Sequence, residues 1–436
     1  MNRDSNRVLV AVLALSVGAR VAASLVMGDT VVPLPGTYDQ VSYHNLALRV
    51  LAGHGFSFGE AWWPLTAADA PTAHWSFLYT LFLVAVYGIF GPHPLAARLI
   101  QAVAVGILQP LLAYGITREL YGEKPGMVAA ALTAAYAYFV YYAATLMTEP
   151  FYITAILGSL YLAILLVRKP AGAGRHPSES RTGQIALSLG LLLGTAVLLR
   201  QLFIVVVPFL LLWLAWADPK WRMKHSALVL GVLVVLILPF SLYNAARFHR
   251  FVLLNTNAGY AFFWANHPIH GVRFQPILPS ATYVDLIPSA LRSLDEAALD
   301  QALLRRGVEF VVGEPLRYLA LSASRIPAYF MFWPSADSGT VSNVSRVASF
   351  GVLWPFMLVG AVRAVRARGS WRDWLRSPGF LLLLFIVVYT AIHLLSWALI
   401  RYRLPVDAVA LVFAAEALVA LASWLRSRLP LPARRT

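Results

Sequence analysis

The sequence has 436 residues, of which 59% are hydrophobic and only 13% are charged, and it contains no cysteine. Soluble domains carry about 25% charged residues, so this composition excludes a disordered chain, a coiled coil and a disulfide-rich secreted domain. Apolar runs recur from one end of the chain to the other, which predicts an all-α polytopic membrane protein. The formal net charge of +15 is spread between these runs, so topology has to be considered before nucleic-acid binding.

Ten apolar runs are candidate spans, because a helix needs about 20 residues to cross a bilayer. The fifth and sixth runs are short and are separated by Arg200-Gln201, so we expect two helices joined by a tight turn there. In chain order the runs cover residues 8–27, 95–117, 126–147, 151–167, 184–199, 202–217, 226–243, 347–362, 380–400 and 404–425.

The basic residues between the runs predict the orientation. If the N-terminus is cytoplasmic, the short inner segments contain Arg118, Lys124 and the basic clusters within 168–181 and 363–376. Short cytoplasmic loops are enriched in Lys and Arg, so this arrangement accounts for the positive charge and places both termini in the cytoplasm. Nucleic acid is therefore not expected as a partner.

One further run, residues 74–91, is also apolar enough to span. A span there would move Arg118, Lys124 and the cluster within 168–181 to the outside, against the positive-inside rule. We therefore expect an interfacial or re-entrant helix on the outer side, because re-entrant backbone is tolerated where protein buries it.

Two long outer segments interrupt the spans, and both contain helix signals. Thr37 and Gln40 have the spacing of a capping box that opens a helix ending near Leu51, and Ser293 and Glu296 have the same spacing. We expect these helices to lie along the membrane surface. The predicted organisation is a seven-span amino-terminal module (1–243) with a first outer loop (28–94), an outer loop with interfacial helices (244–346) and a three-span carboxy-terminal part (347–436).

Two carboxylates are candidate catalytic groups. Asp39 lies at the start of the helix in the first outer loop, and Glu149 precedes Pro150 between the third and fourth spans. An acid at a helix start is also explained by the helix dipole or by N-capping. The predicted topology, however, places both carboxylates at the same outer membrane surface.

The sequence RYRLP at residues 401–405 places two arginines at the outer end of the ninth span, where basic residues are disfavoured. Guanidinium forks suit a lipid phosphate, although snorkelling to a headgroup is an alternative. Residues two apart on a helix point about 200° apart, so both reach one phosphate only if Pro405 keeps the backbone extended. We expect Arg401 to contact phosphate, with Arg403 anchoring the loop or meeting a headgroup; Arg200 is a weaker member of the set.

The remaining polar and aromatic residues give weaker signals. No metal-ligand spacing, nucleotide-binding loop or serine-hydrolase motif is present, so no cofactor is predicted, and a divalent metal has no support in the sequence. The aromatic pair Trp62-Trp63 and the tyrosines within 136–142 fit a membrane belt or sugar stacking. Four histidines fall on the outer side, where they are candidates to line a cleft: His44, His54, His74 and His267.

A series of loose motifs follows one order along the chain. It comprises Tyr38-Asp39, residues 51–56 (LAGHGF), Pro71-Thr72-Ala73 with an apolar helix ending at Phe90-Gly91, residues 95–98 (LAAR), Leu120-Tyr121-Gly122, Thr148-Glu149, Pro239-Phe240 with Asn244, Asn266-His267-Pro268 and residues 401–405. This order resembles the GT-C glycosyltransferases of the dolichyl-phosphate-mannose protein mannosyltransferase and lipid A aminoarabinose transferase type.

The resemblance implies that the protein moves a sugar from a polyprenyl-phosphate donor to a hydroxyl of a lipid, glycan or protein, at the outer face of a prokaryotic plasma membrane. Asp39 would be the general base of an inverting transfer, Glu149 would orient a substrate, and cations would stabilise the leaving phosphate. The predicted substrate-binding residues are Arg401, Arg403, Tyr38, His74, Arg200, Asn266 and His267.

A secondary transporter or a lipid flippase is the alternative function. Such proteins tend to have repeated halves and ionisable groups near the membrane midplane. The sequence has no obvious repeat, and its spans are nearly free of acidic residues. A lipid-binding or scaffolding membrane protein is a third, weaker alternative.

Overall fold

The computed structural model describes residues 3–167, 179–218, 221–336, 338–367 and 369–428, and these residues form helices joined by turns and loops, with three isolated β-bridges and no strand. The predicted all-α architecture is thus confirmed. The elements are α1 (Arg3–Met27), α2 (Asp39–Leu51), α3 (Phe77–Phe90), α4 (Pro94–Tyr121), α5 (Glu123–Ala135), α6 (Ala137–Ala143), α7 (Glu149–Val167), α8 (Glu179–Leu199), η1 (Gln201–Val205), α9 (Val206–Ala217), α10 (Met223–Phe248), α11 (Ala258–Asn266), η2 (Pro268–His270), α12 (Ser280–Asp285), η3 (Ser289–Leu291), α13 (Glu296–Gly313), α14 (Pro315–Tyr329), α15 (Thr340–Arg346), η4 (Val347–Gly351), α16 (Val352–Arg366), α17 (Trp371–Leu375), α18 (Pro378–Leu395) and α19 (Ile400–Arg428).

Within the described residues, eight helices are long and apolar enough to cross a membrane: α1, α4, α7, α8, α10, α15 to α16 taken as one helix, α18 and α19. The pair α5 and α6, bent by 54°, makes a ninth if it is one span. The sixth predicted run, residues 202–217, corresponds to Gln201–Ala217, a shorter apolar helix. The expected count of ten is therefore not confirmed, because this segment reaches only the lower limit of a spanning length.

The additional run at 74–91 forms α3, which has 14 residues. At 1.5 Å per residue such a helix is about 21 Å long, which is shorter than the roughly 30 Å hydrocarbon core. Ser76 caps it, accepting a hydrogen bond from the Tyr79 N–H and donating one to the Leu198 carbonyl at the end of α8. Its length agrees with a helix that does not span.

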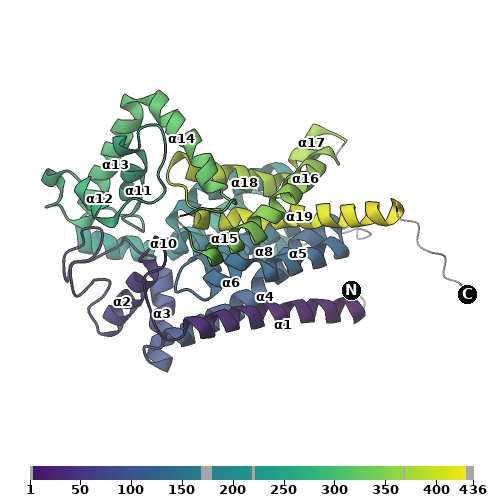
Figure 1. Ribbon diagram of the computed structural model, residues 1–436, viewed down its shortest axis with the longest axis horizontal. Coiled ribbons are helices and arrows are strands. Elements are labelled where there is room, and N and C mark those ends of the chain that lie inside the picture. Colours follow the sequence, from purple (N-terminus) through teal and green to yellow (C-terminus); the bar gives the residue numbers. More distant parts are fainter. Residues whose placement is uncertain (1–2, 168–178, 219–220, 337, 368, 429–436) are drawn as a thin grey trace, which may run out of the picture.

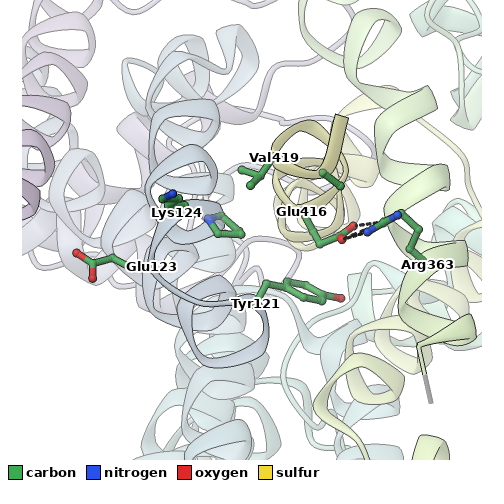
Figure 2. A pocket seen from close by; sticks show the side chains of 8 residues that line it. Tyr121, Glu123, Lys124, Arg363, Glu416 and Val419 are labelled. Carbon is green, nitrogen blue, oxygen red and sulfur yellow. Dashed lines mark hydrogen bonds and ion pairs between the residues drawn. The ribbon is translucent and has the colours of Figure 1, made fainter. Parts of the chain in front are cut away.

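The bundle has two distinct ends (Figure 1). The start of α1 and the end of α19 lie at one end, whereas α2 and α11 to α14 gather at the other. At the first end, Lys124, Arg363 and Glu416 line an open cavity of about 510 Å³, and Arg363 forms an ion pair with Glu416 at 2.9 Å (Figure 2). Most of the predicted basic cluster within 168–181 lies outside the described residues.

The first predicted capping box does not form. Helix α2 begins at Asp39 without a side-chain cap. The Gln40 side chain turns inward instead, donating to the Val32 carbonyl and accepting from Arg98 and from the Leu146 N–H, each at 3.4 Å. Burial explains the difference, because a buried amide has to satisfy its donor and acceptor groups within the protein.

The second predicted box is also wrong. Asp295, not Ser293, caps α13 by accepting from the Ala298 N–H at 2.8 Å. The neighbouring Glu296 is buried and points away from its own helix start, toward the first outer segment.

The Glu296 carboxylate joins the two outer segments. It accepts hydrogen bonds from the hydroxyls of Thr66 and Thr72, both at 2.7 Å, from the Ala73 N–H at 2.8 Å and from the Thr256 hydroxyl at 2.5 Å. A buried carboxylate is tolerated only with such partners. The two outer segments are therefore held together as one cap over the end of the bundle.

Candidate active site

A cavity of about 810 Å³ lies between the outer segments and the adjoining ends of the spanning helices. Its size is that of a typical small-molecule site. The polar residues at the helix ends that line it are Asp39 at the start of α2, Thr148 before α7, Arg200 after α8, and Arg401 in the first turn of α19. Four separate elements thus converge on one space.

Four charged side chains form a connected cluster beside this cavity, which we call the charged quartet: Asp39, Glu149, Arg200 and Arg401. Arg401 Nη1 lies 2.5 Å from Asp39 Oδ2 and 3.9 Å from Glu149 Oε1. Arg200 Nη2 lies 2.5 Å from the same Glu149 oxygen. Two carboxylates and two guanidinium groups therefore alternate, and the quartet carries no net charge.

Helix ends explain most of this arrangement. Asp39 and Glu149 are the first residues of α2 and α7, where the helix dipole favours negative charge. Arg200 follows the last residue of α8, whose C-terminal end favours positive charge. Arg401, in the first turn of α19, stands against this preference, so its two carboxylate partners have to compensate.

The four members differ in exposure. The side chain of Glu149 is 1% exposed, whereas those of Arg401, Arg200 and Asp39 are 14%, 18% and 23% exposed. Burial by itself would raise the pKa of Asp39, but the Arg401 guanidinium and the Thr37 hydroxyl hold this pKa below its ordinary value. Asp39 is therefore an ionised carboxylate and the most accessible member of the quartet.

Comparison with known proteins identifies the architecture. Residues 74–243 match the family model described as dolichyl-phosphate-mannose-protein mannosyltransferase. The structure resembles the archaeal oligosaccharyltransferase AglB from Archaeoglobus fulgidus in complex with an inhibitory peptide and a dolichol-phosphate, with a TM-score of 0.61, 17% identity, and coverage of 100% of this chain and 53% of that chain. For the apo oligosaccharyltransferase of the same organism the TM-score is 0.62 at 17% identity, with 97% of this chain and 51% of that chain covered. The protein has the GT-C fold.

Other comparisons give weaker similarity or none. ArnT from Cupriavidus metallidurans bound to undecaprenyl phosphate gives a TM-score of 0.43 at 15% identity, with 97% of this chain and 81% of that chain covered. None of the curated proteins matches the sequence at a significant level. The chain spans about half the length of the archaeal oligosaccharyltransferase. The apolar helices and the GT-C fold together make the protein an integral membrane protein.

Two more of the predicted substrate-binding residues line the cavity of this GT-C bundle. Tyr38 is half-exposed beside Asp39. His74 is buried, and its Nδ1 has no hydrogen-bond partner. Burial lowers the pKa of His74, an effect that nearby Glu296 and Asp39 only partly offset, so the imidazole is neutral near pH 7.

Arg403 does not line the cavity. Residues 401–405 lie inside helix α19, so the extended backbone that would let both arginines reach one phosphate does not form. Arg403 is completely buried, and it donates to Asp407 Oδ1 at 2.9 Å and to the Tyr329 carbonyl at 2.7 Å. Pro405 removes only one backbone hydrogen bond, and close packing of α19 holds the helix across it. Arg403 thus anchors α19 to the end of α14.

Asn266 and His267 also lie outside the lining of the cavity. The Asn266 Oδ1 accepts from Arg325 at 2.8 Å, and its amide donates to the Phe262 carbonyl. The His267 Nδ1 accepts from the Ile269 N–H at 3.1 Å. These polar groups complete local structure, which sequence position alone does not distinguish from substrate binding.

His44 and His54 likewise do not line the cavity. His44 Nδ1 lies 2.9 Å from the Tyr87 hydroxyl, and His54 is exposed. Within the described part of the chain, no group of three or more His, Cys, Asp or Glu side chains is positioned to hold a metal ion.

Sequence reasoning missed several residues of the cavity. Gln201 exchanges hydrogen bonds with the backbone of Asn255, both at 3.0 Å, and thereby fixes the α8 to η1 turn against the second outer segment. Tyr402 lies beneath both cluster arginines, with the guanidinium carbons of Arg200 and Arg401 at 5.2 and 5.1 Å from its ring centroid. The sequence did contain a signal for both residues, because Gln201 follows Arg200 and Tyr402 follows Arg401, and both arginines were candidate site residues.

Proposed function

We propose that this protein is a membrane glycosyltransferase that moves a sugar from a polyprenyl-phosphate-linked donor to a hydroxyl acceptor. The observation that carries the proposal is the charged quartet beside a cavity that spanning helices and outer segments share. The family match over 74–243 and the dolichol-phosphate in the similar oligosaccharyltransferase support the same class of donor.

Arg401 and Arg200 are the groups suited to the donor phosphate. Guanidinium forks form strong, charge-assisted hydrogen bonds with phosphate oxygens. Arg401 is bound to carboxylates in the present structure, so a phosphate has to compete with Asp39 and Glu149 for it. Arg200 keeps its hydrogen bond from Nε to the Thr148 hydroxyl at 3.1 Å, which fixes the plane of the guanidinium.

This competition activates the base. Once phosphate draws Arg401 away, the Asp39 carboxylate loses the partner that lowers its pKa, and burial then raises its affinity for a proton. Asp39 can then remove the proton of an acceptor hydroxyl as the oxygen attacks the anomeric carbon and the bond to phosphate breaks. Donor binding and base activation are coupled in this scheme.

The leaving polyprenyl phosphate gains negative charge as the glycosidic bond breaks, and both arginines stabilise it. Glu149 positions them, because one oxygen lies 2.5 Å from Arg200 and 3.9 Å from Arg401. Its other oxygen is buried without a hydrogen-bond partner. Glu149 is buried and is not among the residues that line the cavity, so its part in this scheme is to position the two arginines.

The sidedness is part of the proposal. Asp39 of the charged quartet begins α2, and α2 lies at the end of the bundle where α11 to α14 gather, opposite the start of α1 and the end of α19 (Figure 1). Together with the positive-inside rule, this arrangement supports the proposal that the reaction takes place on the outer face of a prokaryotic plasma membrane, with both termini in the cytoplasm.

The test is Asp39→Asn in the purified full chain, reconstituted with radiolabelled polyprenyl-phospho-sugars and a membrane extract as the source of acceptor. Asparagine retains the shape but cannot accept the proton, so turnover should fall by roughly 10²- to 10⁴-fold while donor binding persists. The matched control is Asp69→Asn, an exposed aspartate of the same outer segment that pairs with Arg49. Near-normal turnover of Asp39→Asn would contradict the proposal.

A further inference from the structure

A group of aromatic side chains lines the same cavity on the side of the outer segments. We call it the aromatic wall: Trp63, Tyr260, Trp264, Tyr283 and Trp397. The ring centroids are 5.3 Å apart for Trp63 and Trp264, 5.0 Å for Trp264 and Tyr283, and 5.8 Å for Tyr283 and Trp397. These rings come from both outer segments and from the turn between α18 and α19, not from the spanning helices.

Several buried polar atoms of this lining have no partner in the protein. They are Nε1 of Trp63 and Trp75, Nδ1 of His74 and the hydroxyl of Tyr260, and all four side chains line the cavity. His74, Trp75 and Tyr260 are 8%, 7% and 1% exposed. Buried polar groups are nearly always hydrogen-bonded, and an unsatisfied one is costly. Four of them around one cavity therefore point to a ligand with several hydroxyl groups.

Other members of the wall are satisfied within the protein. Trp264 Nε1 donates to the Tyr283 carbonyl at 2.8 Å, and the Tyr283 hydroxyl accepts from the Leu278 N–H at 2.9 Å. The unpartnered atoms are thus a selected subset and not a general feature of these aromatic residues.

The surrounding structure holds the unpartnered atoms in place. Glu296 binds the Ala73 N–H, and Asn255 donates to the carbonyls of Ala73 and Trp75 at 3.0 and 2.8 Å. Asp300 accepts from the N–H groups of Gly259 and Tyr260 at 2.7 and 3.3 Å. Such preorganisation lowers the entropic cost of binding.

We infer that the aromatic wall binds a saccharide and that the acceptor of the proposed transfer is a carbohydrate hydroxyl. A sugar ring offers C–H faces, which stack on the negative faces of aromatic rings, and hydroxyls at its edge, which match the unpartnered N–H and O–H groups. This inference rests on the proposed function only in assigning the saccharide to the acceptor.

The chain segments that supply the aromatic wall favour an acceptor saccharide over the donor sugar as its ligand. The arginines suited to the lipid phosphate lie at the ends of α8 and α19. Four of the five wall residues belong to the outer segments, so an acceptor arriving from the aqueous side meets the wall first. The donor sugar stays next to its phosphate, at the charged quartet.

Saturation-transfer NMR on the full chain in nanodiscs tests the inference, with methyl glycosides of glucose, galactose, mannose and N-acetylglucosamine as probes. The variant Trp63→Phe/Tyr260→Phe removes two unpartnered donors and keeps an aromatic ring at each position, so folding should persist. We expect at least one glycoside to bind the wild type and its affinity to fall roughly 5- to 100-fold in the variant, as two lost hydrogen bonds predict. Trp424→Phe, an exposed tryptophan distant in the chain, is the control.

Parallel binding measurements with undecaprenyl phosphate, with and without a linked sugar, show whether the saccharide at the wall belongs to the acceptor or to the donor. If the double variant leaves both lipids unaffected, the wall is an acceptor site. If it weakens only the sugar-linked lipid, the wall holds the donor sugar and the acceptor assignment is overturned. Binding of serine-containing peptides in place of every glycoside would overturn the saccharide itself. If the wild type binds glycosides but neither form of undecaprenyl phosphate, the result would contradict the proposed function and still support a saccharide site at the aromatic wall.

Discussion

Replacement of Arg401 with alanine should weaken binding of undecaprenyl phosphate strongly. Hydrogen bonds to charged groups contribute about 1.5–3 kcal/mol, which corresponds to roughly 10- to 100-fold in affinity. The structure adds a second effect. Removing one guanidinium from the charged quartet leaves Asp39 and Glu149 with Arg200 alone, so a neutral site becomes negative and repels phosphate.

The two effects separate in a double variant. Arg401→Ala combined with Asp39→Asn restores neutrality without restoring the fork, so it should recover part of the lost affinity. Arg401→Lys retains the charge but loses bidentate geometry, and we expect an intermediate affinity. Arg250→Ala is the control, because Arg250 pairs with Asp295 in an outer segment and does not line the cavity.

The assay is equilibrium binding of labelled undecaprenyl phosphate to the purified protein, with a thermal melt of each variant to confirm folding. Unchanged affinity in both Arg401→Ala and Arg401→Lys would refute the phosphate role of this residue. An affinity of the double variant no better than that of Arg401→Ala would refute the argument from charge balance.

Three further predictions concern stability and topology. Arg403→Ala should cost about 3–5 kcal/mol of stability, because it leaves the fully buried Asp407 without its ion-pair partner, and thermal melts should show this loss. Burial raises the pKa of Asp300 to about 7, above its unfolded value, so stability should fall as pH rises from about 4 to about 7; denaturation across this range should show the slope, and Asp300→Asn should remove it. Because the chain has no cysteine, single cysteines at Glu60 and Lys124 should be labelled by an impermeant thiol reagent from the outside and from the cytoplasm, respectively, and the reverse pattern would invert the topology.

Several features of this protein follow from the sequence because they depend on local chemistry. A span is a property of about 20 consecutive residues, so every predicted run falls on a helix or helix pair. Asp39, Glu149 and Arg401 could be singled out as candidate site residues because acids at helix starts and an arginine at an outer interface are recognisable from the local sequence. The prediction that α3 does not span followed from the basic residues further along the chain, and its 14-residue length agrees.

Tertiary structure decided which of those residues meet. Arg401 and Arg403 differ little in sequence context, yet helix α19 turns one toward Asp39 and buries the other against Asp407. Glu296 carries the signal of a helix cap but is held by donors more than 200 residues away, as in its bond to Thr66. Hydrogen bonds and ring contacts between distant segments depend on how helices pack, and no local pattern encodes that packing. For this reason the sequence could predict polar chemistry at one membrane surface, while only the folded chain showed which side chains share the cavity.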